Sequence, residues 1–327
     1  MTIRSLTGPP LLIEEPPPPL VERRVIARVR TAALATDFDS VYFGDLARDE
    51  LYAAPKRGGD RVRIGDRAPL EIAVGERITW IGAPGNVVLE TPEGVRDGGA
   101  GAVLAQTTGA FTDVASDSRD VLVTDALRSG GVLMRMSSGA QSAGAAGTDG
   151  RDGSATSRAA AARAVRLAAL DVRPRELAID AANAYVLSER AVHAVPRTGG
   201  APRLLLEGVD LAGLEVAGGF LFTTGKIGSS RALLRFSTAG GAPVVLEGSV
   251  RESPVPAPFA LFAEEVYFVD AEQPELRRVA VTGGPSGMVA RAPEVARATE
   301  LVVDGSGIYL ATEDEIGPVV LGLPRPP

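Results

Sequence analysis

The chain has 327 residues, of which 45% are hydrophobic and 23% charged, so its composition is that of a globular protein with one to three domains. The formal net charge of −7, with arginines and acidic residues interspersed, argues against a nucleic-acid-binding surface. With no cysteine and one histidine, the chain excludes disulfides, thiolate metal sites, thiol nucleophiles and a two-histidine metal site of its own.

The N-terminal segment, residues 1–20, is rich in proline. Residues 9–19 predict extended, polyproline-like backbone, which we expect to be a tether; a docking motif for a proline-binding partner is the alternative. The apolar run at 11–13 is too short for a secretory signal, and no run approaches the roughly 20 apolar residues of a membrane span. The sequence therefore predicts a cytoplasmic protein, with export by another route as the alternative.

A short pattern recurs along the chain: two apolar residues, an aspartate, a brief loop, and a run containing an aromatic residue. It occurs as LATDFDSVYF (34–43), LAIDAANAYVL (177–187) and LVVDGSGIYL (301–310), and in shorter form as LFAEEVYF (261–268). Weaker copies lie at 72–81, 114–123 and 214–222. The aromatic position recurs on average about every 44 residues, and it is filled by Tyr42, Thr79, Leu122, Tyr185, Leu221, Tyr267 and Tyr309.

The second half of each unit repeats as well. Residues 50–64, 190–208, 231–248 and 275–290 each contain an alternating run, a Gly-Gly turn and another apolar run. Alternation is the period of a β-strand, and Gly-Gly between two such runs predicts a hairpin. The best-formed unit thus predicts strands at 177–180, 184–188, 191–196 and 202–207. Four strands every 40–45 residues are typical of a β-propeller blade.

Seven copies predict an all-β propeller of seven four-stranded blades, forming a single domain over residues 21–327. The last unit, 299–327, holds only three strands, whereas residues 21–28 precede the first unit without partners. We therefore expect this N-terminal strand to complete the last blade, which would close the ring and hide two sheet edges. Six blades, with 70–107 as irregular structure, are the alternative.

These blades resemble those of bacterial β-propellers with TolB-like or YWTD-like repeats. The resemblance rests on the D-x-x-x-φ-Tyr opening and the hairpin with its Gly-Gly turn, and it covers roughly residues 29–327. It implies a binding platform, although some such propellers are enzymes.

Residues 137–162 interrupt the third unit and are rich in glycine, serine and alanine. This composition buries little apolar area, so we predict a flexible surface insertion. A lid or an arm for a partner is the alternative, and a short helix over 157–164 is compatible with the sequence.

The chemistry-bearing residues have structural interpretations that we favour. His193 lies in a predicted strand without a serine or acidic partner assignable by spacing, so we expect a structural histidine rather than a general base. Asp37, Asp180 and Asp304 share one blade position, where an aspartate fixes a turn more often than it ligates a metal. We therefore assign no catalytic residue, no metal and no cofactor.

One constellation predicts a ligand. Arg30, Arg173 and Arg297 each lie seven residues before a repeated aspartate, and Arg67 and Arg175 are close to this register. They precede the innermost strand, so their guanidinium groups would converge at an axial mouth and favour an anionic ligand. The alternative is that each arginine pairs with a neighbouring acidic residue, for which the sequence offers Asp171, Asp210 and Glu300.

We accordingly predict a non-catalytic binding or scaffold propeller whose partner is a protein or an anionic small ligand. A propeller hydrolase or lyase acting in the axial cleft is one alternative, and a structural subunit of a larger assembly is another. We expect no nucleic-acid partner and no membrane span.

Overall fold

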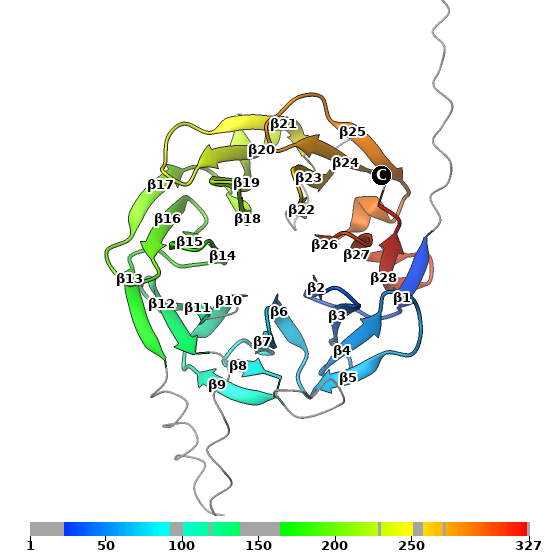
Figure 1. Cartoon of the computed structure of the whole chain (residues 1–327), viewed down its shortest axis with the longest axis horizontal. Helices are drawn as coiled ribbons and strands as arrows, with labels where there is room; N and C mark the ends of the chain where they lie inside the picture. The colour runs from blue at the N-terminus through cyan, green and yellow to red at the C-terminus, as the bar shows by residue number, and fades with distance from the viewer. Residues whose placement is uncertain are drawn as a thin grey trace, which may run out of the picture.

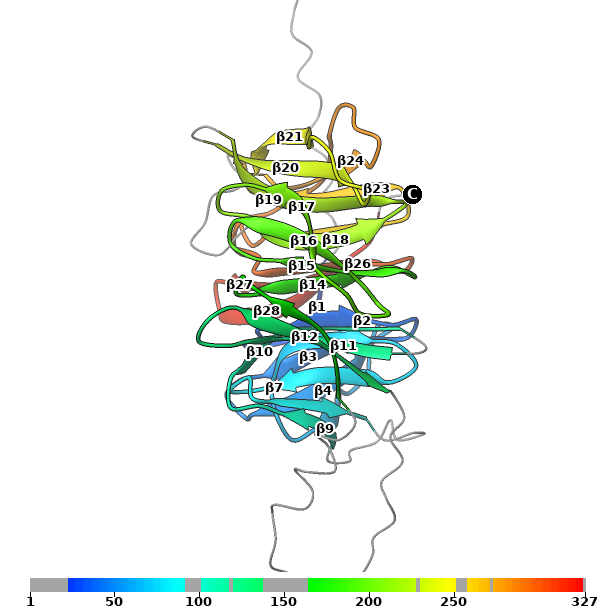
Figure 2. The same ribbon diagram turned by 90° about the vertical axis from the view of Figure 1, so that its left-hand side faces the viewer.

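The computed structural model describes residues 23–91, 101–117, 120–137, 164–227, 230–250, 258–270 and 273–325. The predicted N-terminal tail, residues 1–20, and residues 138–162 of the predicted insertion lie outside these residues. The described residues form seven four-stranded antiparallel sheets arranged around a central axis (Figure 1). Seen from its edge, the molecule is a disc in which neighbouring sheets stack (Figure 2). The prediction of seven four-stranded blades is confirmed.

The first three blades follow the chain in order, from the innermost strand to the outermost. Blade 1 comprises β2 (Leu34–Thr36), β3 (Ser40–Asp45), β4 (Glu50–Pro55) and β5 (Val62–Gly65). Blade 2 comprises β6 (Pro69–Val74), β7 (Ile78–Gly82), β8 (Val87–Glu90) and β9 (Ala102–Gln106). Blade 3 comprises β10 (Ala110–Ser116), β11 (Asp120–Ala126), β12 (Gly131–Ser137) and β13 (Val165–Leu170). The six-bladed alternative is wrong, because residues 69–106 supply a complete blade.

The next three blades repeat this order. Blade 4 comprises β14 (Glu176–Ile179), β15 (Asn183–Leu187), β16 (Ala191–Pro196) and β17 (Arg203–Glu207). Blade 5 comprises β18 (Ala212–Ala217), β19 (Phe220–Ile227), β20 (Ser230–Ser237) and β21 (Val244–Val250). Blade 6 comprises β22 (Phe259–Phe262), β23 (Glu265–Val269), β24 (Glu275–Ala280) and β25 (Gly287–Arg291). A single 3₁₀ turn, η1 (Val295–Arg297), precedes blade 7.

Blade 7 is built from both ends of the described chain. It holds β26 (Glu300–Val303), β27 (Ile308–Asp314) and β28 (Gly317–Leu323), and its outermost strand is β1 (Arg24–Ala27). β1 pairs antiparallel with β28, with Val25 opposite Leu321. The predicted closure by an N-terminal strand is therefore confirmed, and β1 leaves β28 without a free edge.

The aromatic position of the repeat occupies one place in every blade. Each of its seven residues pairs with a residue of the innermost strand, an alanine in five blades and a valine in two; the pairs are Ala35–Tyr42, Ala73–Thr79, Ala115–Leu122, Ala178–Tyr185, Val216–Leu221, Ala260–Tyr267 and Val302–Tyr309. The small partner lets neighbouring sheets approach near the axis. The weak copies in blades 2, 3 and 5 are thus true members of the repeat.

The core lies between adjacent blades. Trp80 of blade 2 is fully buried and packs with Tyr42, Leu51 and Ile64 of blade 1. A Cβ built on Gly65 would lie only 2.8 Å from the Trp80 ring, so this position requires glycine. Stacking thus buries the faces that an isolated four-stranded sheet would leave exposed.

The antiparallel order assigns every turn to one of two faces. Turns between the first and second strands, and between the third and fourth, lie on one face, which we call the turn face. The connections between blades and the turns between the second and third strands lie on the other, the connection face. Within the described residues, no helix is long and apolar enough to cross a membrane.

Candidate functional site

The repeated aspartates fix the turns that follow the innermost strands. Asp180 Oδ1 accepts hydrogen bonds from the backbone N–H groups of Ala182 (2.8 Å) and Asn183 (2.7 Å), and its Oδ2 accepts one from the Tyr185 hydroxyl (2.5 Å). Burial opposes ionisation of Asp180, but these donors outweigh it and lower its pKa. Asp37 repeats the arrangement with Tyr42. The aspartate and the tyrosine of the motif are thus one hydrogen-bonded unit.

A cation joins this unit to the preceding blade in two places. Arg197 donates to the Asp180 carbonyl of its own blade (3.1 Å) and to Asp117 (2.5 Å) and Asp120 (3.1 Å) of blade 3. Lys56 does the same between blades 1 and 7. Its Nζ donates to the Asp37 carbonyl and to the Asp304 carboxylate, and it lies 5.4 Å from the centre of the Tyr309 ring. These cations fasten neighbouring blades across the turn face.

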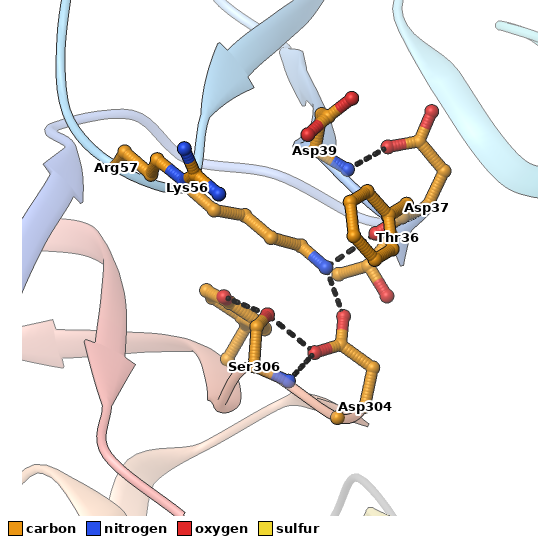
Figure 3. A pocket seen from close by; sticks show the side chains of 10 residues that line it. Thr36, Asp37, Asp39, Lys56, Arg57, Asp304 and Ser306 are labelled. Carbon is orange, nitrogen blue, oxygen red and sulfur yellow. Dashed lines mark hydrogen bonds and ion pairs between the residues drawn. The ribbon is translucent and has the colours of Figure 1, made fainter.

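A cavity of about 600 Å³ opens on the turn face where blade 7 meets blade 1 (Figure 3). We call it the seam cavity; its walls are the β2–β3, β4–β5 and β26–β27 turns, and it is lined by Thr36, Asp37, Phe38, Asp39, Lys56, Arg57, Asp304, Gly305, Ser306 and Tyr309. An adjoining cavity of about 310 Å³ shares Lys56, Ser306 and Tyr309 with it and reaches Arg23, Arg24 and Pro324. We call the two adjoining cavities together the seam groove.

The charged groups in the seam cavity are mostly engaged within the protein. Asp304 Oδ1 accepts from the backbone and hydroxyl of Ser306 (2.8 and 2.6 Å), while its Oδ2 accepts from Lys56. Burial would raise the pKa of Asp304, but the bonds from Lys56 and Ser306 hold it below the usual range. A paired lysine and an ionised aspartate of lowered pKa make a poor proton-transfer pair.

Phe38 is the unusual residue of this cavity. Its side chain is 87% exposed at the rim, whereas the corresponding turn residues of blades 4 and 7 are Ala181 and Gly305. No turn requires an aromatic residue here, and exposing one to water gains the fold nothing. The sequence analysis missed Phe38 because a lone aromatic residue in a turn belongs to no periodic pattern.

Five carboxylates surround the axis on innermost strands. Each of them lies shortly before the innermost-strand residue that pairs with the repeated aromatic position. The separation is two residues for Glu71, Asp113, Glu176 and Glu300, and one residue for Glu215. The strands that carry them, β6, β10, β14, β26 and β18, line the centre of the disc (Figure 1). We call these residues the axial carboxylates. Their common position in the repeat is visible in the sequence, but the sequence-based prediction of site residues did not include them.

Burial raises the pKa of all five axial carboxylates, and two of them also accept backbone hydrogen bonds that oppose this shift. Asp113 accepts from the backbone N–H of Leu177 in the next blade (2.5 Å), and Glu176 likewise accepts from Gly213 (2.9 Å). Burial and the charge of Glu176 raise the pKa of Glu215 to about 7 and that of Glu300 to about 8. The described residues contain no group of three or more acidic or histidine side chains placed to hold a metal ion.

The five predicted arginines all lie on connections between blades, on the connection face. Arg30 follows β1, Arg67 follows β5, Arg173 and Arg175 precede β14, and Arg297 ends η1. All five side chains are exposed. The Arg67 guanidinium donates to the Ala83 carbonyl at 3.2 Å. The charge of Arg175 opposes the raised pKa of Glu176, and the convergence of the five guanidinium groups at an axial mouth stays a prediction.

His193 is buried in β16. Burial lowers its pKa, despite the opposing charges of Asp171 and Glu207, so the imidazole is neutral near pH 7. Its Nδ1 has no hydrogen-bond partner within the described residues. This environment is that of a packed core side chain.

Comparison with known proteins identifies the fold and no family. No family model matches the chain, and no curated protein matches it in sequence. The WD40 β-propeller domain of Doa1 superposes with a TM-score of 0.64 and 9% identity, covering 92% of this chain and 96% of that domain. The Cps50 (Swd1) propeller domain of Myceliophteria thermophila gives 0.61 and 9%, covering 93% and 100%.

An enzyme is also among the similar structures. A puromycin-hydrolysing peptidase of Mycobacterium tuberculosis superposes with a TM-score of 0.61 and 15% identity, and the match covers 92% of this chain but 54% of the peptidase. At these identities the likeness concerns the β-propeller fold alone.

Proposed function

We propose that this protein is a non-catalytic binding propeller that takes an extended, proline-containing polypeptide segment in the seam groove. The observation that carries the proposal is the exposed Phe38 at the rim of a cavity whose charged groups are largely engaged within the protein. Burying a phenylalanine side chain contributes about 1.5–3 kcal/mol, so Phe38 alone would supply a useful part of a binding energy.

The shape and chemistry of the groove favour this class of ligand. Its two cavities share Lys56, Ser306 and Tyr309 and therefore adjoin, and their other lining residues extend from the β2–β3 turn to Arg23 and Pro324, which offers an extended chain several contact points. Phe38 offers an exposed aromatic side chain, whereas Tyr309 is buried beside Lys56; Ser306 and the turn backbone offer polar groups. Aromatic side chains in grooves recognise polyproline II segments, whose preformed backbone loses little entropy on binding.

The test is a titration with a fluorescein-labelled decaproline peptide, followed by fluorescence anisotropy. The protein is a full-length variant, the four-serine variant, in which Pro16, Pro17, Pro18 and Pro19 are replaced by serine, because the chain's own proline run would compete. We expect saturable binding that weakens at least tenfold on adding Phe38→Ala, which corresponds to about 1.4 kcal/mol.

The matched control is Ile316→Ala. Ile316 is another exposed apolar residue, but it lies in the β27–β28 turn on the connection face. This substitution should leave decaproline binding unchanged. Absence of binding, or equal losses from the two substitutions, would contradict the proposed function.

A further inference from the structure

The seam groove lies where the described chain begins. Arg23, the first described residue, and Arg24 line the adjoining cavity, and the Arg24 guanidinium donates to the Lys56 carbonyl in the β4–β5 turn. Residue 19 precedes Arg23 by four residues, which span at most about 14 Å. The chain length before Arg23 therefore allows residues 9–19 to reach the groove.

The composition of this segment matches what the groove offers. Residues 9–20 read PPLLIEEPPPPL, with six prolines, three apolar residues in a row and two consecutive glutamates. Prolines and leucines are suitable partners for the exposed face of Phe38. Arg57 is exposed in the cavity and has no ion pair within the described residues, so it could receive Glu14 or Glu15.

We propose that residues 9–20 bind in the seam groove of their own chain and compete there with other polypeptides. This inference rests on the proposed function, and it adds a regulator to the site. A tethered segment acts at a high effective concentration, so even a weak intramolecular contact would occupy the groove most of the time. An external ligand would then bind well only after displacing the segment.

The first experiment measures protection of the segment in the full-length protein. A glutamate-specific protease cuts the Glu14–Glu15 bond, and intact-mass spectrometry follows the loss of the N-terminal fragment. We expect cleavage at least tenfold slower in the wild type than in the full-length Phe38→Ala variant. The Ile316→Ala variant should behave like the wild type. Equal rates in wild type and Phe38→Ala would overturn the inference.

The second experiment separates this inference from the proposed function. A labelled peptide of residues 8–20 is titrated into the wild type and into the four-serine variant. We expect at least tenfold tighter binding by the four-serine variant, because its own segment no longer competes. Equal, Phe38-dependent binding by both proteins would overturn the inference and leave the proposed function standing, whereas loss of decaproline binding would remove the proposed function itself.

Analytical ultracentrifugation distinguishes binding within one chain from binding between two. The wild type should sediment as a monomer at the concentrations of the protease assay. A wild-type dimer that dissociates in the four-serine variant would show that the segment binds a second copy, and it would overturn the intramolecular form of the proposal.

Discussion

Carboxylates of one chemical type have opposite roles in this protein because their surroundings differ. Asp180 and Asp304 accept several hydrogen bonds at turns, and their pKa values are lowered. Glu215 and Glu300 occupy the innermost strands close to Glu176, and burial and that charge raise their pKa values. The turn aspartates therefore support folding as anions, whereas the axial glutamates do so as neutral acids.

The raised pKa values of Glu215 and Glu300 predict that the stability of the fold depends on pH. A pKa raised from 4.5 to about 7 or 8 means that the folded chain keeps protons that the unfolded chain has released. The free energy of unfolding should therefore be highest near pH 4.5 for these groups and fall as the pH rises towards 8. Substituting Glu215→Gln and Glu300→Gln together should make the free energy of unfolding less dependent on pH. At pH 8 the double variant should be more stable by on the order of 2 kcal/mol, which is less than the pKa shifts alone would give because both side chains are partly exposed.

Urea unfolding at pH 5, 6.5 and 8 measures this effect. Glu189→Gln is the control, because Glu189 is an exposed glutamate between β15 and β16 and lies away from the axis. Among the described residues, the innermost strands β2 and β22 contain no ionisable side chain, and the other titratable groups on innermost strands are Glu71, Asp113 and Glu176, whose pKa values burial also raises. An unchanged slope in the double variant would show that the two glutamates ionise freely in the folded state.

At the scale of elements, β1 determines whether the ring is complete. Ala27 is buried, and Ile26 packs against the cluster shared by blades 7 and 1, with Val320 and Phe43. At the connection face, the Arg28 guanidinium donates a hydrogen bond to the Asp314 carboxylate at 3.1 Å. A strand far from blade 7 in sequence thus supplies its outer edge.

Removing residues 1–28 should therefore cost several kcal/mol, because it uncovers the edge of β28 and exposes apolar side chains of this cluster. Thermal unfolding followed by circular dichroism and the sedimentation coefficient are the measurements. Removing residues 1–20 is the matched control, since it leaves β1 in place and should preserve a cooperative transition. A 29–327 chain with the melting temperature of the full-length protein, still monomeric, would contradict the role of β1.

At the scale of the whole molecule, exposed arginines occupy the connection face, and carboxyl groups of raised pKa occupy the innermost strands around the axis. The exposed arginines lie on connections from four different blade boundaries, and the axial carboxylates lie on the strands that follow. The predicted anion site at the mouth stays a proposal. In this proposal the affinity depends on the protonation of Glu215 and Glu300, because these carboxylates repel an anion when they are ionised.

Citrate titrations at low salt test this proposal by calorimetry. We expect the wild type to bind citrate more tightly at pH 5.5 than at pH 8, and the combined Arg30→Ala, Arg173→Ala and Arg297→Ala variant to bind it at least tenfold more weakly. Raising the salt to about 0.1 M should weaken binding, since screening then acts within about 10 Å. Equal binding by both proteins, or none by the wild type, removes the anion site.

Much of the fold was predictable because each blade is specified locally. The position of Tyr185 recurs at the same strand pairing in all seven blades, and the Gly-Gly pairs form hairpins in which Gly199 and Gly200 adopt positive φ. The missing fourth strand of the last unit also identified β1 correctly. These features depend on periodicity and turn chemistry, which involve neighbouring residues only.

The candidate site depended on contacts that no local pattern specifies. Lys56 and Asp304 are 248 residues apart in sequence and meet only because the ring closes between blades 7 and 1. The axial carboxylates likewise come from five blades, and their raised pKa values arise from mutual proximity and burial. The sequence by itself determined seven blades and their closing strand, whereas only the tertiary structure decided which side chains meet at the seam and the axis, since closing the ring sets those distances.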